Sequence, residues 1–397
     1  MFSSLKVKYF RIYWLGMFVS LIGTWIQSVA QSWLVFELTN SAFLLGVVGF
    51  LGSIPMLVLS LFGGVLADRV NKRNILIFTQ TAFMLLAFLL ATLTQFKLIT
   101  PGQIMFIALF NGIIMAFDAP ARQSIVVELV GKRHLFNAIT LNSVAFNSSR
   151  IIGPAIAGVL ISTIGMSGCF YLNGVSFLAV IVALFYIKFG KSTVRNNNSA
   201  LRDLKEGLIF IRGNRLILAL VSMVAAVSMF GISYVILMPV FANHVLHAGA
   251  KGLGVLMSSI GIGALIGSLG LASLGDFKSK GRLLIGSVFL FSFSLITFSL
   301  SRDYVLSIFA LIFVGCSSLI PIALINTLLQ INVPDEFRGR VMGLFMITFA
   351  GIMPFGNLIS GCLAQSLGVS SALFFCGLTC LVLFTLINFL FPGIKDL

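Results

Sequence analysis

The amino-acid sequence predicts an all-α integral membrane protein with twelve transmembrane helices in two six-helix bundles. Hydrophobic residues make up 59% of the 397-residue chain and charged residues only 9%. The apolar residues form twelve stretches of about 20 residues, the helix length that crosses the hydrocarbon core of a bilayer. The mean hydropathy of +1.10 excludes a water-soluble domain. In lipid only helices and closed barrels satisfy their own backbones, and these stretches have the length of helices.

The predicted spans fall into two sets of six, separated by the longest polar stretch of the chain. The first set, in the N-terminal bundle 1–189, is 9–36, 43–67, 75–96, 103–119, 136–161 and 169–189. The second set, in the C-terminal bundle 216–397, is 216–241, 253–275, 283–300, 304–330, 341–363 and 372–391. Residues 190–215 are predicted to form a cytoplasmic linker with an amphipathic helix on the membrane surface, because apolar residues recur there at helical spacing.

Basic residues are distributed unevenly between the two ends of these spans. With both termini inside, 22 of the 26 Lys and Arg residues are cytoplasmic, and Lys97, Lys251 and Arg302 are outside. Basic residues near span ends are retained on the cytoplasmic side, so the sequence predicts this orientation in the cell inner (plasma) membrane. The net charge of +15 is then a topology signal beside anionic lipid, and no nucleic-acid partner is expected.

The residue types that carry enzyme or metal chemistry do not form recognisable groups. The five cysteines fall in or beside spans without His or carboxylate neighbours, which favours a packing role. No P-loop, Ser/His/Asp set or metal-ligand spacing is found. We expect no cofactor, no metal and no enzymatic activity.

The first span is longer than the apolar core of a signal peptide, so it is expected to stay in the membrane.

The segment that closes the second span resembles a segment that closes the eighth. At an offset of 208 residues, four positions coincide: Leu66, Asp68, Lys72 and Leu76 with Leu274, Asp276, Lys280 and Leu284. Parallel six-span repeats are typical of one large class of secondary transporters. The pattern Gly64-x-Leu66-Ala67-Asp68-Arg69-x-Asn71-Lys72-Arg73-x-x-Leu76 resembles the loop signature of the major facilitator superfamily, from which it departs at Asn71, where the superfamily usually has Gly. The stretches SVAQSWLVFELTNS and DAPARQSIVVELV are similar to the branch with siderophore (enterobactin-type) and macrolide exporters.

This resemblance implies the major facilitator fold and secondary active export of a small amphipathic or anionic molecule by alternating access, with protons as a possible partner. It also implies that Asp68 latches the two halves when the cytoplasmic side is closed. We further expect Asp118 to pair with Lys72 or Arg73. The predicted conformational switch comprises Gly64, Asp68, Arg69, Lys72, Arg73 and Asp118.

Arg150 lies near the middle of the fifth span, where a charge is costly and usually faces a bundle interior or a wet cavity. Ser143, Asn147, Pro154 and Gly158 share its face at steps of three and four residues. We predict one of two roles for Arg150. It is either a structural Arg bonded to backbone carbonyls or helix C-termini, or an Arg that contacts an anionic substrate or takes part in gating. The other candidates for substrate binding are Asn147, Gln27, Gln31, Asn111, Asn326 and Gln330. Polar residues of this kind more often join two helices than contact a ligand.

The run Gly153-Pro154-Ala155-Ile156-Ala157-Gly158 resembles the antiporter motif of the superfamily, although one glycine of its usual ending is replaced by Ala157. Small residues let helices approach closely, so this run is predicted to pack on the glycine-rich eighth span. The eighth-span glycines are Gly254, Gly261, Gly263, Gly267 and Gly270.

The coupling ion and the direction of transport are weakly marked. Glu37 is the coupling candidate, since it is an acid near membrane depth. The alternatives are an uptake carrier for a nutrient or lipid and a transport-inactive membrane sensor or scaffold of the same fold. The expected partners are a small-molecule substrate and the lipid bilayer, and the resemblance adds protons as a coupling ion. A monomer is expected.

Overall fold

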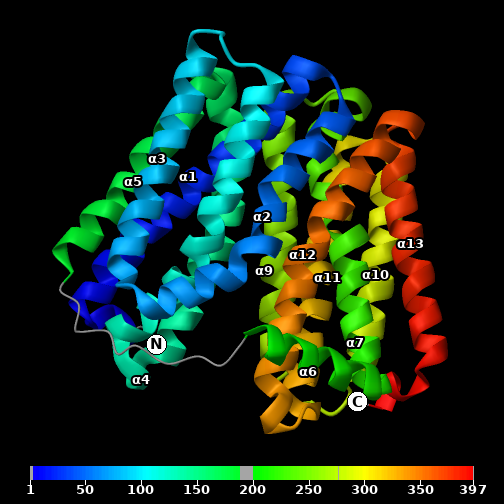
Figure 1. Ribbon diagram of the computed structural model, residues 1–397. Coiled ribbons are helices and arrows are strands. Elements are labelled where there is room, and N and C mark those ends of the chain that lie inside the picture. Colours follow the sequence, from blue (N-terminus) through cyan, green and yellow to red (C-terminus); the bar gives the residue numbers. More distant parts are fainter. Residues whose placement is uncertain (1–2, 188–199, 276, 397) are drawn as a thin grey trace. The chain divides into compact units, whose positions relative to one another are not determined.

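The computed structural model describes residues 3–187, 200–275 and 277–396, and all regular structure in these ranges is helical (Figure 1). Twelve helices in the described ranges are long and apolar enough to cross a membrane, as predicted. By backbone contacts the chain forms two compact units. Unit 1 comprises residues 1–39, 54–197 and 250–258, and unit 2 comprises residues 40–53, 198–249 and 259–397.

The helices have the following bounds. The first half contains α1 (Lys8–Thr39), α2 (Ala42–Arg69), α3 (Lys72–Gln95), α4 (Pro101–Thr163) and α5 (Gly165–Tyr186). The second half contains α6 (Ala200–Gly213), α7 (Arg215–Ala226), α8 (Met238–Val240), α9 (Gly249–Ser273), α10 (Lys280–Leu300), α11 (Tyr304–Asn332), α12 (Asp335–Leu367) and α13 (Val369–Leu390). Short 3-10 helices lie at Ser3–Lys6 and Pro392–Asp396.

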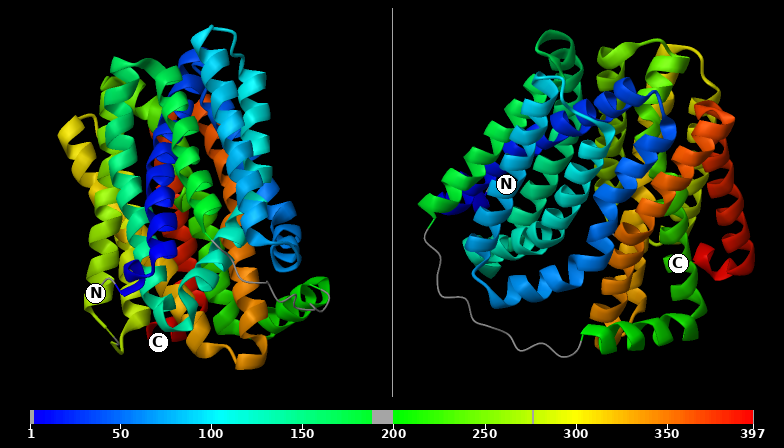
Figure 2. Two further views of the ribbon diagram at one scale, coloured as in Figure 1. Left: turned by 90° about the vertical axis from the view of Figure 1, so that its left-hand side faces the viewer. Right: turned by 45° about the horizontal axis from the view of Figure 1, so that its top comes forward.

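The fourth and fifth spans are joined without a loop, which corrects the predicted connection between residues 119 and 136. Helix α4 continues past residue 119 to Gly131, reverses direction there, and forms a second arm from Arg133. Gly131 has φ 66° and ψ 175°, a conformation that residues with a Cβ avoid. Hydrogen bonds from Ser4 to Asn137 hold the N-terminus beside this reversal (Figures 1 and 2).

The seventh span, predicted as one helix, is built from several kinds of helix. Between α7 and the end of the span lie π-helical turns at Val227–Gly231 and Phe241–Val245. A 3-10 segment, Ser233–Leu237, and the short α8 separate them. The whole segment Arg215–Val245 still has the length and hydropathy of a span.

Helix α6 lies across the ends of neighbouring helices of unit 2 (Figure 2). The ring of its Phe210 stacks on Phe337 at the start of α12, with 4.3 Å between ring centroids. Arg340 of α12 pairs with Glu206 at 3.0 Å. Leu208 and Ile209 are exposed, so α6 carries apolar side chains on its outer surface. Its place on the membrane surface stays a prediction.

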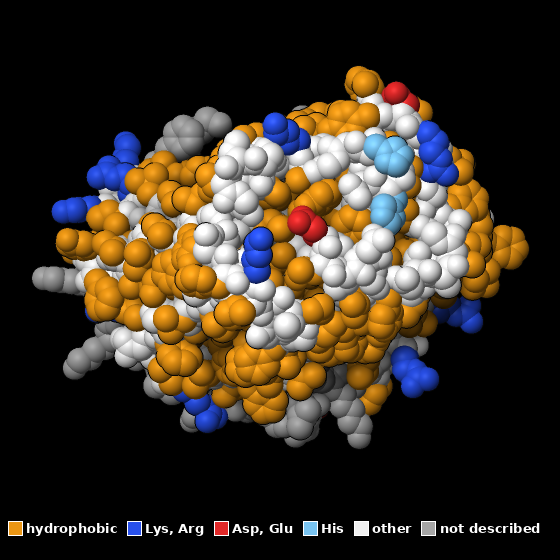
Figure 3. Space-filling model, turned by 90° about the horizontal axis from the view of Figure 1, so that it is seen from above, with side chains coloured by type: hydrophobic (Ala, Val, Ile, Leu, Met, Phe, Trp, Pro, Cys, Tyr) orange, Lys and Arg blue, Asp and Glu red, His pale blue; other side chains and the backbone are white. Residues whose placement is uncertain are grey.

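Charged side chains are sparse at the end of the molecule that holds the α1–α2 connection. Seen from this end, the surface is mostly apolar or uncharged, with scattered basic and acidic side chains (Figure 3). The sequence predicts few basic residues at the outer ends of the spans, but which face of the molecule lies outside the cell stays a prediction.

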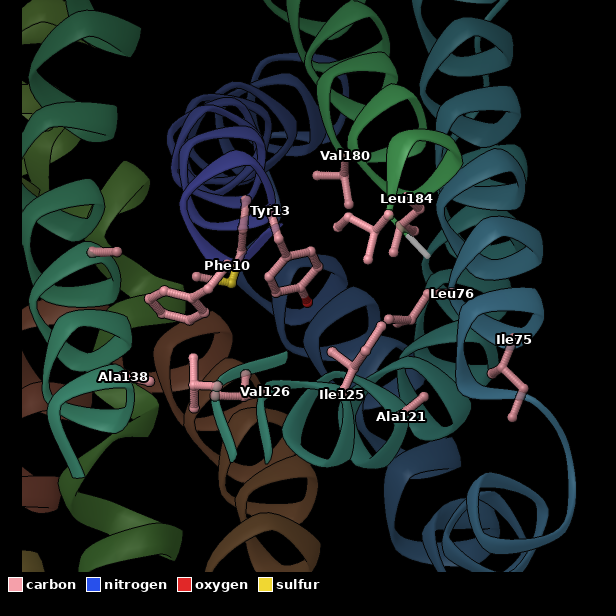
Figure 4. Packing of buried hydrophobic residues seen from close by; sticks show 14 of the residues in the cluster. Phe10, Tyr13, Ile75, Leu76, Ala121, Ile125, Val126, Ala138, Val180 and Leu184 are labelled. Atoms are coloured by element: carbon pink, nitrogen blue, oxygen red, sulfur yellow. The ribbon is translucent and has the colours of Figure 1, made fainter. Parts of the chain in front are cut away.

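The core of unit 1 at its opposite end gathers apolar side chains from α1, α3, α4 and α5. Phe10 and Tyr13 of α1 are fully buried among Leu76, Ile125 and Leu184 (Figure 4). The Tyr13 hydroxyl is buried without a hydrogen-bond partner among the described residues. This packing fixes α1 against the two arms of α4, which together form the site described next.

Candidate functional site

Unit 1 contains a cavity of about 600 Å³ between α1 and the two arms of α4. A volume of this size is typical of pockets for small molecules. The lining is mostly apolar and includes one cation and four uncharged polar side chains, three of which come from the second arm. The lining residues are Met17, Leu21, Arg122, Gln123, Val126, Val127, Leu135, Ile139, Asn142, Ser143, Phe146 and Asn147.

Arg122 reaches this cavity from a buried polar network around Asp118. The carboxylate of Asp118 is fully buried, and its Oδ2 accepts from Arg122 Nε at 2.9 Å and from Nη2 at 2.8 Å. Its Oδ1 accepts from Thr79 Oγ1 at 2.7 Å and from Gln80 Nε2 at 2.8 Å. Four donors therefore compensate a charge that would otherwise be expensive to bury.

The predicted pairing of Asp118 with Lys72 or Arg73 is wrong. Lys72 pairs instead with Glu128, and Arg73 donates to the carbonyl oxygen of Phe185 at 3.2 Å. The physical reason is helical spacing, since Asp118 and Arg122 are four residues apart on one helix and meet without a second element.

The remaining members of the predicted switch are Gly64, Arg69 and Asp68. Gly64 is half-buried with open space where a Cβ would be, and Arg69 is exposed. The side chain of Asp68 lies outside the described part of the structure, so its role as a latch stays a prediction.

Arg150 lies near the middle of the second arm of α4, in the candidate span Arg133–Thr163. It is half-buried, and no hydrogen bond or ion pair joins it to another described residue. Asn147, one helical turn earlier on the same face, lines the cavity. The opposite side of this arm, including Val144 and Val159, is exposed as expected for lipid contact. The bonded, structural alternative for Arg150 therefore finds no support among the described residues.

The fifth and eighth spans meet at a pair of glycines, as the small-residue pattern predicts. A Cβ on Gly254 of α9 would lie 2.5 Å from the carbonyl oxygen of Pro154 and 2.9 Å from the Cα of Gly158. The predicted contact with the fifth span is wrong for Gly263, Gly267 and Gly270. Gly263 and Gly267 pack on the backbone of α11 around Cys316, and Gly270 has open space around it.

The remaining predicted site residues do not line the cavity. Gln27 is buried and accepts a hydrogen bond of 2.7 Å from Asn173, which joins α1 to α5. In α11, Gln330 Nε2 donates to Asn326 Oδ1 at 2.5 Å. Glu37 is exposed near the end of α1. The other three have no described contact to the cavity: Gln31 and Asn111 are half-buried, and Gly153 packs on Trp25.

Three polar cavity residues, Arg122, Gln123 and Asn142, were not among the sequence candidates. Arg122 was counted only as a basic loop residue because the fourth span was predicted to end at residue 119, and the structure extends this helix to Gly131. The i,i+4 spacing of Asp118 and Arg122 would have identified the pair. Asn142 lies one position before Ser143 of the predicted polar stripe. Nothing in the sequence distinguishes it from the other Asn and Gln residues within the spans as a cavity residue.

The chain is similar to several bacterial transport proteins over most of its length. It is 26% identical to a staphyloferrin A transporter of Staphylococcus aureus over 357 residues, which cover 89% of this chain and 88% of that protein. It is 24% identical to macrolide efflux protein A of Streptococcus pyogenes over 375 residues, with 93% and 92% covered. It is 25% identical to the enterobactin exporter EntS of Shigella flexneri over 340 residues, with 85% and 80% covered.

Solved transporter structures share the fold. A bacterial homologue of the human lysosomal transporter Spinster superposes with a TM-score of 0.75 at 11% identity, and 98% of each chain is covered. The nucleoside transporter NupG gives 0.73 at 16% identity, with 96% of this chain and 99% of that chain covered. The family profile described as transmembrane secretion effector matches residues 1–396. The chain therefore belongs to this family of major facilitator superfamily transporters.

Proposed function

We propose that this transporter exports a small, amphipathic, anionic molecule across the bacterial inner membrane by alternating access. The observation that carries the proposal is Arg150, a guanidinium near the middle of a membrane span without a partner among the described residues. A charge at that depth is retained where it meets water, a counter-charge or a ligand. An anionic group on the substrate supplies the counter-charge, and Arg binds a carboxylate through two parallel hydrogen bonds.

The cavity beside Arg150 fits the rest of such a molecule. Arg150 is seven residues beyond Ser143, which is about 10 Å along the helix axis. A ligand whose apolar part occupies the cavity against Leu135 and Phe146 therefore places an anionic end within reach of Arg150. The relatives named as a macrolide efflux protein and an enterobactin exporter support an outward direction of transport.

Transport measurements on matched variants test the role of Arg150. Arg150→Gln is expected to reduce export of anionic compounds far more than export of neutral compounds of similar size, and Arg150→Lys to weaken recognition while keeping the charge. Arg133→Gln is the control, because it removes the same charge from the exposed start of the same arm. Equal losses for anionic and neutral compounds, or no loss, would contradict the proposal. Accumulation rather than extrusion by intact cells would favour the uptake alternative.

The orientation proposed for this function has both termini and residues 190–215 in the cytoplasm. The support is the asymmetry of basic residues and the sparse charge on the face shown in Figure 3. A single cysteine placed at Asn197 in a variant without the five native cysteines should react with an impermeant reagent only after cells are opened. Reaction in intact cells would reverse the orientation.

We include proton antiport in the proposal because the run that contains Gly153, Pro154 and Gly158 resembles the antiporter motif of the superfamily. The contact between Gly158 and Gly254 supports a tight helix crossing, which limits ion leak along these spans. Export that persists when the proton gradient is collapsed would remove this coupling. Asp68→Asn is proposed to slow transport while leaving insertion intact, since a latch shifts populations of conformers rather than the fold.

A further inference from the structure

Phe146 of α4 presents an accessible aromatic ring to the cavity of unit 1. It is one of the lining residues, and 47% of its surface is exposed. We propose that this ring selects substrates whose anionic group is attached to an aromatic ring, and that Trp25 of α1 holds the Phe146 ring in position. The inference rests on the proposed function and narrows its substrate class to amphipathic aryl carboxylates.

The accessible surface of Phe146 belongs to the polar face of the second arm. Ser143, three residues earlier, and Asn147, the next residue, also line the cavity. Arg150 follows Phe146 by four residues, so their side chains are neighbours on the helix surface. Val144 is exposed as well, but it does not line the cavity. The ring of Phe146 is therefore placed among polar cavity residues, whereas the exposed valine suits lipid.

Trp25 packs on the Phe146 ring from α1. The two rings meet edge to face, with 6.1 Å between their centroids and 64° between their planes. Gly153 permits this approach, because a Cβ there would contact the Trp25 side chain and would lie 3.1 Å from the carbonyl oxygen of Ile22. Aromatic rings prefer such edge-to-face contacts to a parallel sandwich. The contact therefore fixes the plane in which Phe146 meets a ligand.

The spacing of Phe146 and Arg150 determines where the ligand carries its charge. Residues four apart on a helix have Cβ atoms about 5–6 Å apart. A ligand ring that packs on Phe146 therefore brings a carboxylate bonded to that ring close to Arg150. Arg150 has no counter-charge among the described residues, so its guanidinium is available to donate to this carboxylate.

The other apolar lining residues accept the body of the ligand without distinguishing its type. Met17 and Leu21 of α1 and Leu135 of the second arm gain from buried apolar area, whether that area is aliphatic or aromatic. A contact between two aromatic rings gains free energy beyond the area that it buries. An accessible Phe ring beside a cation thus favours an aromatic anion over a saturated anion of the same shape.

Two probes of one carbon skeleton and one charge test the assignment: para-tert-butylbenzoate and its ring-saturated analogue, para-tert-butylcyclohexanecarboxylate. Binding of each to purified, detergent-solubilised protein is measured by calorimetry. The quantity of interest is the ratio of the two dissociation constants in each variant, because this comparison cancels the different hydrophobicity of the probes. We expect Phe146→Leu to shift this ratio by about 2- to 12-fold toward the saturated compound, which corresponds to the loss of one aromatic contact.

Matched variants locate this preference. Phe136→Leu is the control, because Phe136 lies on the same arm, is 85% exposed and does not line the cavity, so the ratio should stay at the wild-type value. Phe146→Tyr keeps a ring and should keep the ratio, and it serves if the Leu variant fails to fold. Trp25→Leu should shift the ratio in the same direction as Phe146→Leu, and Trp25→Phe should restore it.

Trp25 also reports on the site by its fluorescence. The chain has three tryptophans, so Trp14→Phe/Trp33→Phe leaves Trp25 as the single emitter. We expect para-tert-butylbenzoate to change this emission saturably, over the concentration range in which calorimetry detects binding. Binding without any change in emission would place the ligand away from the Trp25–Phe146 pair and overturn the inference.

Two further results separate this inference from the proposed function. An unchanged ratio in Phe146→Leu removes Phe146 as the selecting residue and leaves anion export in place. If the wild type binds and transports neither carboxylate, while the uncharged para-tert-butylbenzyl alcohol is exported, both the inference and the proposed anionic substrate fail.

Discussion

Removal of the Arg122 guanidinium is the most informative perturbation of this fold. Asp118 is fully buried, and Arg122 supplies two of its four donors. In Arg122→Met the carboxylate keeps only the bonds from Thr79 and Gln80 and loses its counter-charge. Breaking a buried ion pair from one side costs about 3–5 kcal/mol. We therefore expect Arg122→Met to lower the free energy of unfolding by that amount.

The reverse single change is expected to be milder. In Asp118→Asn the side chain still accepts from Thr79 or Gln80, and the unpaired Arg122 reaches the cavity, since 23% of its side chain is accessible. The expected loss is about 1–3 kcal/mol. The double variant Asp118→Asn/Arg122→Met removes both charges together and should be more stable than Arg122→Met alone.

Unfolding of the four proteins in the same detergent, followed by denaturant titration, measures these differences. The double-mutant cycle should show strong coupling between the two positions. The reason is that Asp118→Asn removes the negative charge that Arg122→Met leaves buried without a counter-charge. Additive losses would refute the reasoning, since they would mean that the pair contributes no mutual stabilisation. A double variant less stable than either single variant would refute it as well.

The other predictions concern backbone geometry and a surface pair. Gly254→Ala should lower the free energy of unfolding by about 1–3 kcal/mol, because the new Cβ would lie 2.5 Å from a carbonyl oxygen. The control is Gly270→Ala in the same helix, which meets open space and should be neutral or slightly stabilising in the same unfolding assay. Gly131→Ala should cost about 1–3 kcal/mol, measured by the same titration, since φ 66° is strained for alanine. Glu206→Gln should change stability by at most about 1 kcal/mol in the same unfolding titration and make that stability less dependent on salt, because its pair with Arg340 is about one-third exposed.

Most of the fold follows from the sequence because hydrophobic length is a strong signal. The twelve spans were found from apolar stretches alone, and α6 from apolar residues at helical spacing. Hydropathy does not predict the α4 reversal, because the charged residues between positions 120 and 135 interrupt the apolar stretch, although helices continue through this segment on both sides of Gly131. The changes of helix type between Val227 and Val245 depend on tertiary packing, which hydropathy does not record.

The site was predicted less completely than the fold. The polar stripe of Ser143 and Asn147 could be read from spacing, and both residues line the cavity. The role of Gln27 could not be read, because an amide that joins two helices and an amide that faces a ligand look alike in one sequence. Arg122 and Asn142 required the path of α4 through Gly131, since that path brings the two arms together around the cavity.

The mixed helix types of the seventh span have a mechanical consequence. A π turn holds one more residue than an α turn, so conversion of the turns at Val227–Gly231 to α geometry would advance the following residues by one position. Such a step rotates them by about 100° around the helix axis and moves them by about 1.5 Å along it. Side chains such as Tyr234 would then face new neighbours while α7 stayed in place. The part of the seventh span that follows Gly231 could therefore rotate about the helix axis while α7 keeps its position.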